Sequence, residues 1–386
     1  MEQEFHKPHI GIIGGGPAGC FCAYQLQNFC DVTIFEAAAP LKTLLVTGGG
    51  RCNLAHARYD FRELAKFYPR GEKFLYSIFS KFSTADTLEA FRSIGVETYT
   101  QEDNRIFPTT NSAADVRAKL LAAISAVTIK KEKALRVNSL NGKLEVVTVL
   151  GSYEFDSVIV ATGGHAGYNI AKYLGHNIIE PRPALVGLKT DKIFHSGVVL
   201  KNVKTKIGKQ VLQDDILFTH NGISGPLAFK ISSLMARGKF PYTVTLDITG
   251  DVDLQKMFNE NPHKTLKNLV GELVPKSFAA EICPSGDIKC SQVSAKIREE
   301  LMKNLRSLEL KVLSTSGGGE VVTCGGVDLK EINPKTMESK LVPNLYFCGE
   351  VLDIDGFCGG FNLQNCWSTA FIAAEGIKHG LHRSTS

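Results

Sequence analysis

The sequence predicts an α/β fold, and three observations carry this prediction. Residues 9–36 read as a strand, a glycine-rich turn, a helix and a second strand, and residues 341–379 again read as strand, turn and helix. Between them, residues 188–316 change character, first to alternating strands and then to charged helices. Since 386 residues exceed what one compact core holds, we predict two domains. Residues 1–187 and 317–386 form a Rossmann-type domain, which an inserted domain with a β part and a helical part interrupts.

The first strand, turn and helix have the pattern of a dinucleotide site. HIGIIGGGPAG places Gly14, Gly16 and Gly19 at GxGxxG spacing, and Glu36 ends the next strand 22 residues past Gly14. Gly16 lets the backbone approach a pyrophosphate, and the helix N-terminus offers free N–H groups to it. Glu36 can accept hydrogen bonds from ribose hydroxyls. The predicted cofactor contacts in this segment are Gly14, Gly16, Pro17, Ala18, Gly19 and Glu36.

The rest of the first domain is predicted to be helical and then strand-rich. Apolar residues at three- and four-residue spacing predict four helices, over residues 61–67, 72–82, 84–95 and 112–124. Strands follow over residues 127–160, with Asn141-Gly142 as a hairpin turn. The last of them ends in ATGG, where we expect Ala161, Thr162 and Gly163 to pass near the dinucleotide.

The inserted domain is predicted from a change of pattern. Residues 188–250 alternate like antiparallel strands, and residues 252–312 become helical and charged. The glycine run 317–319 marks the return to the first domain.

The C-terminal segment regains the character of a cofactor site. An apolar strand ends at Gly349-Glu350, and the loop Gly359-Gly360-Phe361-Asn362 opens a helix that runs to about His379. Its N-terminal amides can face the pyrimidine edge of a flavin and stabilise negative charge there.

Cofactor-like segments occur near both ends of the chain, the glycine-rich turn near the N-terminus and the strand and helix near the C-terminus. This arrangement favours FAD, bound non-covalently, over NAD as the resident dinucleotide. A flavoprotein typically holds the ADP half with its first βαβ unit and the ring with a C-terminal strand and helix. The segment ATGGHAGY lacks the GxGxxG register, so no second nucleotide fold is predicted. The ten cysteines form no CxxC pair and no zinc spacing, so we predict no metal and disfavour a disulfide reductase.

The composition and net charge limit the kinds of molecule that we expect the protein to bind. The net charge of +5, read as thinly spread, falls short of the basic footprint of a dedicated nucleic-acid binder. No run of apolar residues is long enough to span a membrane, and no signal peptide precedes the fingerprint. We therefore expect a cytoplasmic protein that binds a small molecule and neither nucleic acid nor membrane.

Several motifs together resemble a known family. TGGGRCN (47–53), NRIFP (104–108), FTHNGISGP (218–226) and GEVLDIDG with GGFNLQ look like the BaiN/YhiN-type NAD(P)/FAD-dependent oxidoreductases. The resemblance extends from residue 9 to about 378, and fumarate-reductase flavoproteins are more distantly similar. It implies an FAD domain interrupted by a β-barrel-like and helical insertion. One departure follows Glu36, where three alanines supply no basic side chain.

The resemblance places TGGGRCN beside the flavin, and the residue types agree. Three consecutive glycines let backbone lie flat against a ring, Arg51 can meet a pyrophosphate or an anionic substrate, and Asn53 can bond to the ring edge. The predicted contacts are Gly48, Gly49, Gly50, Arg51, Cys52 and Asn53.

The predicted chemistry is two hydride transfers. NAD(P)H, as a transient co-substrate, reduces FAD, which passes the hydride to a small enone-, steroid- or quinone-like acceptor. A general acid must then protonate the opposite carbon. Cys52 and His220 are the candidate catalytic residues; Tyr168 is a further one, and Arg105 is a candidate binder of a carbonyl or carboxylate. Two alternatives stay open: an FAD-dependent RNA-modifying enzyme and a non-enzymatic flavin-binding sensor.

Overall fold

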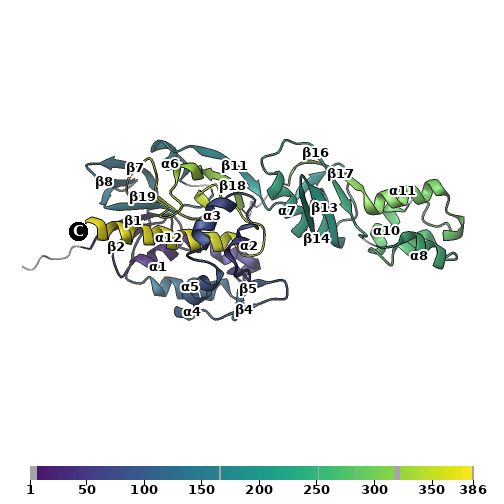
Figure 1. Cartoon of the computed structure of the whole chain (residues 1–386), viewed down its shortest axis with the longest axis horizontal. Coiled ribbons are helices and arrows are strands. Elements are labelled where there is room, and N and C mark those ends of the chain that lie inside the picture. The colour runs from purple at the N-terminus through teal and green to yellow at the C-terminus, as the bar shows by residue number, and fades with distance from the viewer. Residues whose placement is uncertain (1–6, 165–166, 251, 284, 317–321, 385–386) are drawn as a thin grey trace, which may run out of the picture. The chain divides into compact units, whose positions relative to one another are not determined.

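The structure, a computed structural model, describes residues 7–164, 167–250, 252–283, 285–316 and 322–384. It divides into two compact units (Figure 1). The Rossmann unit comprises Met1–Arg182 with Val322–Ser386, and the barrel unit comprises Pro183–Val321. The predicted insertion lies within the barrel unit, whereas the glycine run 317–319 lies outside the described residues.

A five-stranded parallel sheet, in the order β19-β10-β1-β2-β6, forms the centre of the Rossmann unit. Its strands are short apolar runs, and all four residues of β10 are buried, as in a sheet covered on both faces. Helix α1 packs against α12 beside this sheet (Figure 1). The elements are β1 (His9–Ile13), α1 (Pro17–Leu26), β2 (Asp31–Phe35), β6 (Thr128–Lys130), β10 (Ser157–Val160), β19 (Leu345–Phe347) and α12 (Phe361–Ser384).

The sequence-based helices between β2 and β6 are confirmed. Ser112 caps the last of them by accepting a hydrogen bond from the Asp115 amide at 3.3 Å. A small antiparallel sheet among them, β3-β5-β4, was not predicted, because strands of two to four residues are too short to show a period. The elements are η1 (Thr43–Gly50), β3 (Ala55–His56), α2 (Phe61–Ala65), α3 (Glu72–Phe79), α4 (Thr84–Ser93), β4 (Thr98–Thr100), β5 (Arg105–Pro108) and α5 (Ala113–Ala123).

Two further sheets complete this unit. The predicted hairpin turn is present, with Asn141 and Gly142 both at positive φ (51° and 80°), as a type I′ turn requires. It joins β7 (Ala134–Leu140) to β8 (Lys143–Thr148), and β9 (Ser152–Phe155) extends that sheet. The remaining elements are α6 (Tyr168–Tyr173), the paired strands β11 (Ile178–Ala184) and β18 (Val322–Val327), η3 (Leu329–Glu331) and η4 (Gly349–Val351).

The barrel unit contains a closed six-stranded barrel, in the order β12-β15-β14-β13-β16-β17. This confirms the barrel-like insertion that the family resemblance implied. The strands are β12 (Leu188–Thr190), β13 (Val199–Ile207), β14 (Gln210–Thr219), β15 (Gly222–Ser224), β16 (Tyr242–Asp247) and β17 (Leu308–Thr315), and the helices are α7 (Gly225–Met235), α8 (Leu254–Glu260), α9 (Leu266–Val270), α10 (Lys276–Ile282), η2 (Cys290–Gln292) and α11 (Ala295–Arg306).

One part of the helical prediction for residues 252–312 is wrong. Residues from Leu308 onward form β17, which lies between β12 and β16 and closes the barrel. Its burial alternates strictly from Leu308 to Val312, so LELKVLST is a half-buried strand directly after an amphipathic helix. The C-terminal helix α12 begins at Phe361 as predicted and extends past His379 to Ser384. Within the described residues, no helix is long and apolar enough to cross a membrane.

Candidate functional site

The carboxyl ends of the parallel strands meet at one edge of the sheet, where the Gly14 turn follows β1. Gly14 has φ +107°, and a Cβ there would lie 2.4 Å from the carbonyl oxygen of Ala161, at the end of β10. A Cβ on Gly19 would lie 1.9 Å from the Gly14 oxygen. Both positions therefore require glycine, because another part of the backbone lies so close to each of them. The turn lies beside β1 and β10, the two neighbouring strands at which the order of strands along the chain reverses.

The N-terminus of α1 at this turn is uncapped. Gly16 is the N-cap residue, Pro17 follows it, and no acidic side chain lies in the first turn. A Cβ on Gly16 would meet no atom within 4 Å, so open space adjoins the first free amides. This combination of free N–H groups, positive dipole end and open space suits a pyrophosphate.

Glu36 holds the turn from the end of β2. Its carboxylate accepts hydrogen bonds from the Gly15 amide and from the Ala38 amide, each at 2.7 Å. Since a carboxylate accepts about four hydrogen bonds, Glu36 retains capacity for ribose hydroxyls.

The end of β10 contributes an unsatisfied hydroxyl. Thr162 Oγ1 is buried and has no hydrogen-bond partner among the described residues, and Gly163 follows it with φ +74°. A buried polar atom without a partner is uncommon in a folded chain and agrees with a ligand that completes this edge. These observations, taken together, fit a dinucleotide.

The segment after β19 packs directly on the start of α1. A Cβ on Gly349 would lie 2.7 Å from the Ala18 Cβ, and the Gly349 amide donates to Thr369 Oγ1 of α12 at 2.9 Å. Glu350 accepts from the Thr323 amide at 2.8 Å, so its carboxylate is fixed by the start of β18. The two sequence-distant halves of the predicted site thus meet in space.

The TGGGRCN loop lies against the start of α12. In the amide orientation that satisfies both polar atoms, Asn53 donates to the Ala55 oxygen at 3.1 Å and accepts from the Gly360 amide at 3.0 Å. A Cβ on Gly360 would lie 2.4 Å from that same oxygen, so the contact requires glycine. The next residues reinforce it, because Trp367 Nε1 donates to the Leu54 oxygen at 3.0 Å.

The three consecutive glycines are in the left-handed region, at φ +57°, +68° and +85° for Gly48, Gly49 and Gly50. Gly48 is crowded by Asn53 and Phe107, whereas a Cβ on Gly49 would meet nothing within 4 Å. Arg51 lies over the Phe107 ring at 4.1 Å, a cation–π contact that leaves its guanidinium half-exposed. The loop therefore presents bare backbone and one cation.

Several predicted contact residues have structural tasks of their own. Phe361 is buried, with its ring stacked on His56 at 4.5 Å and on Phe67 at 4.6 Å. The Asn362 side chain donates to and accepts from the Gly356 backbone, at 2.9 and 2.8 Å. Only the backbone of these two residues is available to a ligand at the start of α12.

The two candidate catalytic residues lie in different units. Cys52 is buried in the Rossmann unit, and burial raises the pKa of its thiol to about 12. His220 is exposed at the turn between β14 and β15 of the barrel unit. Arg105, also a candidate, pairs with Asp103 at 2.6 Å. Cys52 therefore carries a proton at neutral pH, and His220 is open to solvent.

One buried ion pair was not predicted from the sequence. Arg70 binds the carboxylate of Asp355, which is fully buried in the GEVLDIDG turn. Nothing in the sequence pattern around Arg70 indicates this partner.

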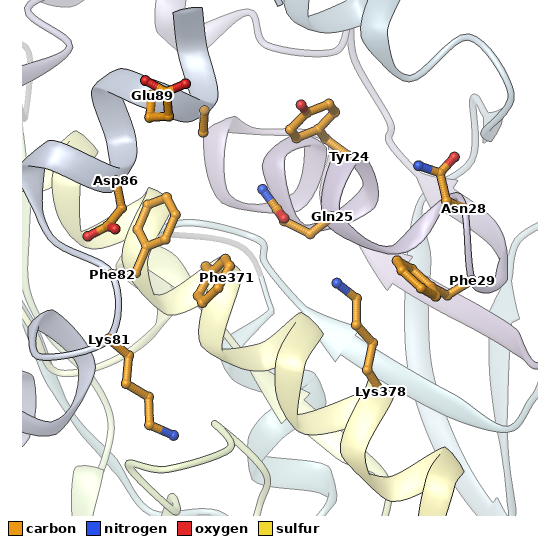
Figure 2. A pocket seen from close by; sticks show the side chains of 11 residues that line it. Tyr24, Gln25, Asn28, Phe29, Lys81, Phe82, Asp86, Glu89, Phe371 and Lys378 are labelled. Carbon is orange, nitrogen blue, oxygen red and sulfur yellow. The ribbon is translucent and has the colours of Figure 1, made fainter. Parts of the chain in front are cut away.

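A separate cavity of about 440 Å³ lies at the far end of α1 (Figure 2). Tyr24 of α1, Phe82 of the segment between α3 and α4, and Phe371 and Lys378 of α12 line it. Since α1 begins at the Gly14 turn and the lining residues Tyr24 and Gln25 belong to the last turn of that helix, this cavity is not the dinucleotide site. Among the described residues, no cluster of three or more His, Cys, Asp or Glu could hold a metal ion.

Comparisons with known proteins agree with this geometry. Residues 8–376 match the family described as HI0933-like protein Rossmann domain. The chain is 30% identical over 406 residues to the 3-dehydro-bile acid delta(4,6)-reductase of Clostridium scindens, covering 95% of this chain and 98% of that one. It is 29% identical over 402 residues to the ribosomal RNA dihydrouridine synthase of Escherichia coli, covering 95% and 97%.

A solved structure shows the same fold at low identity. The open conformation of a flavocytochrome c3 fumarate reductase matches with a TM-score of 0.50 and 14% identity, over 98% of this chain and 79% of that one.

Proposed function

The chain belongs to the family of HI0933-like proteins with a Rossmann domain, and on that premise we propose that it uses NAD(P)H and FAD to reduce a carbon–carbon double bond conjugated to a carbonyl group. Membership makes it an FAD-dependent oxidoreductase. The nicotinamide donor and the acceptor are the proposed part.

The observation that carries the proposal is the uncapped N-terminus of α1, with open space at Gly16. There the first-turn amides would bind the pyrophosphate, and Glu36 would accept from the ribose. The bare backbone at Gly49 and the start of α12 would hold the ring. FAD, when bound, supplies hydride transfer between a nicotinamide and an acceptor.

The protein's own part in the reaction is positioning and proton delivery. The positive ends of the peptide dipoles of α12 lie at its N-terminus, where they would stabilise negative charge on the bound ring. Overall, NAD(P)H, a proton and the alkene become NAD(P)⁺ and the saturated product, so a group must donate that proton. The buried Cys52 thiol and the exposed His220 stay proposals for this role.

The named activities of the relatives support an activated alkene. A delta(4,6)-reductase saturates a carbon–carbon double bond in a 3-dehydro acid, and dihydrouridine is uridine with its C5–C6 double bond reduced. Both bonds are conjugated to a carbonyl, which accepts the charge that hydride addition creates. A small enone is therefore the first candidate acceptor.

The second candidate acceptor is a uracil ring in RNA, which a specific observation favours. The sequence analysis interpreted the net charge as thinly spread along the chain. The distribution of charged residues contradicts that interpretation. Residues 183–250 carry nine Lys and Arg against four Asp and Glu, whereas the rest of the chain carries 35 of each. All of the excess charge lies in the strands and helix of the barrel region, and RNA is the polyanion that such a surface suits.

The acceptor is tested with protein that has been reduced anaerobically by dithionite, which bypasses NAD(P)H. Cyclohexenone, menadione and a uridine-containing RNA are then mixed in separately. We expect the flavin absorbance to return with an alkene acceptor and mass spectrometry to find its saturated product. Reoxidation by oxygen alone would contradict the proposed acceptor class.

A further inference from the structure

We propose that the outer face of the β13–β14 hairpin binds the phosphate backbone of RNA. We call this surface the basic hairpin face; it consists of Lys201, Lys206 and Lys209. The inference rests on the second candidate acceptor, RNA, and assigns the surface that holds it. Figure 1 shows β13 and β14 side by side in the barrel unit.

Strand alternation turns these lysines outward. Along β13, Leu200, Val203 and Thr205 are buried in the barrel, while Lys201, within the register shift between Leu200 and Val203, and Lys206, beyond it, are exposed. Lys209 is exposed in the turn that leads to β14. The three ammonium groups therefore share one solvent-facing surface of a rigid hairpin.

On β14, the residues opposite Lys204 and Lys206 are uncharged, whereas on β16 Asp247 lies opposite Lys204. Lys206 lies opposite Val211, which is 69% exposed, and Lys204 lies opposite Gln213. No carboxylate faces Lys206 from β14.

The carboxylates nearest in sequence are already engaged. Asp214 pairs with Lys230 of α7 at 2.8 Å, and Asp215 accepts from the Asn202 amide at 3.0 Å. Among the described residues, by contrast, Lys201, Lys206 and Lys209 form no ion pair or side-chain hydrogen bond.

Free lysines suit phosphates rather than base edges. An ammonium on a flexible stem is a point charge that neutralises a phosphate without reading sequence. Each neutralised phosphate releases counterions, so binding by this face must weaken as salt rises. The hairpin would thus supply affinity, and the flavin site would select the base.

The test compares two triple variants of the full-length protein with FAD bound. One carries Lys201→Glu, Lys206→Glu and Lys209→Glu. The matched control carries Lys276→Glu, Lys296→Glu and Lys303→Glu, three exposed lysines in the helical part of the same unit, with the same change in charge. Binding of a fluorescein-labelled single-stranded RNA is followed by anisotropy over a range of salt concentrations.

We expect the hairpin variant to bind about tenfold more weakly, with its log–log salt slope reduced by about 2, since each contact to single-stranded RNA contributes about 0.7. The control variant should retain the slope of the unmodified protein. Equal losses in both variants, an unchanged hairpin variant, or preferential binding to vesicles of anionic phospholipid would each overturn the inference.

Cyclohexenone reduction by the same preparations separates this inference from the proposed function. If no alkene is reduced but the hairpin variant still binds RNA more weakly, the proposed function is wrong and the proposed RNA-binding surface is retained. If alkene reduction occurs but the hairpin variant binds RNA like the unmodified protein, only the proposed surface is wrong.

Discussion

The Glu36 carboxylate accepts a hydrogen bond from the Gly15 amide at 2.7 Å, across the turn that joins β1 to α1. The carboxylate at the end of the second strand thereby fixes the backbone of the turn whose amides we propose to bind the pyrophosphate. In that proposal, one side chain couples the shape of the turn to the ribose of the cofactor.

We predict that Glu36→Ala weakens FAD binding about thirtyfold. A hydrogen bond to a charged group contributes about 2 kcal/mol, and tenfold in affinity corresponds to about 1.4 kcal/mol. Titration of the apoprotein with FAD, followed by flavin fluorescence, measures the change. Glu97→Ala, at an exposed position, is the control and should bind like the unmodified chain. Equal affinities for Glu36→Ala and the control would exclude this role.

Two glycine substitutions in the turn should separate binding from folding. Gly16→Ala places its methyl group in open space, so the free energy of unfolding should change by about 1 kcal/mol or less, while FAD affinity falls about tenfold or more. Gly19→Ala places a methyl group 1.9 Å from the Gly14 oxygen and should cost about 3 kcal/mol. Denaturant unfolding and FAD titration of both variants check this contrast. The reverse pattern would mean that the site lies elsewhere.

The buried Arg70–Asp355 pair should behave as a unit. Asp355→Asn removes the charge of a fully buried carboxylate that the largely buried Arg70 contacts, so we expect a loss of about 3 kcal/mol. The double variant Arg70→Met with Asp355→Asn should lose less than the two single changes added together. Additive losses in the unfolding experiments would show that the two residues act independently.

His56 should make the protein sensitive to acid. Burial, and then the charge of Arg58, lowers the pKa of this imidazole to about 4. Its folded-state pKa lies below the ordinary value of 6.5, so its contribution is present above pH 6.5 and is lost as pH falls toward 4. We expect His56→Phe, which keeps the stack on Phe361, to retain about 2 kcal/mol more of its stability over that interval. Parallel pH profiles for both proteins would contradict this assignment.

Much of the Rossmann unit could be predicted from the sequence, because its strands are apolar runs bounded by glycines. The GxGxxG register located the turn to the residue, and the long helix after Gly360 was equally clear. The short strand at Arg105 could not be predicted, since four residues carry no period. Nor could β17, because an alternating strand directly follows a helix of similar composition.

The predicted cofactor contacts lie in four separate segments that the sequence assigns to one FAD, and the structure shows how some of these segments contact one another. The contact between Asn53 and Gly360 joins residues that no pattern relates. Phe361 illustrates the limit of a motif, because its place in the sequence is that of a cofactor contact while its ring belongs to the aromatic core. Local sequence specifies backbone shape well, but it does not say which face of a helix is buried.

An anaerobic titration of the FAD-loaded protein tests the central claim most directly, with NADH and NADPH added in separate experiments. We expect the flavin absorbance band to disappear with at least one of them, and to return when cyclohexenone or RNA is then added. A band that persists with both nicotinamides would contradict the claim that this chain is an NAD(P)H-dependent reductase.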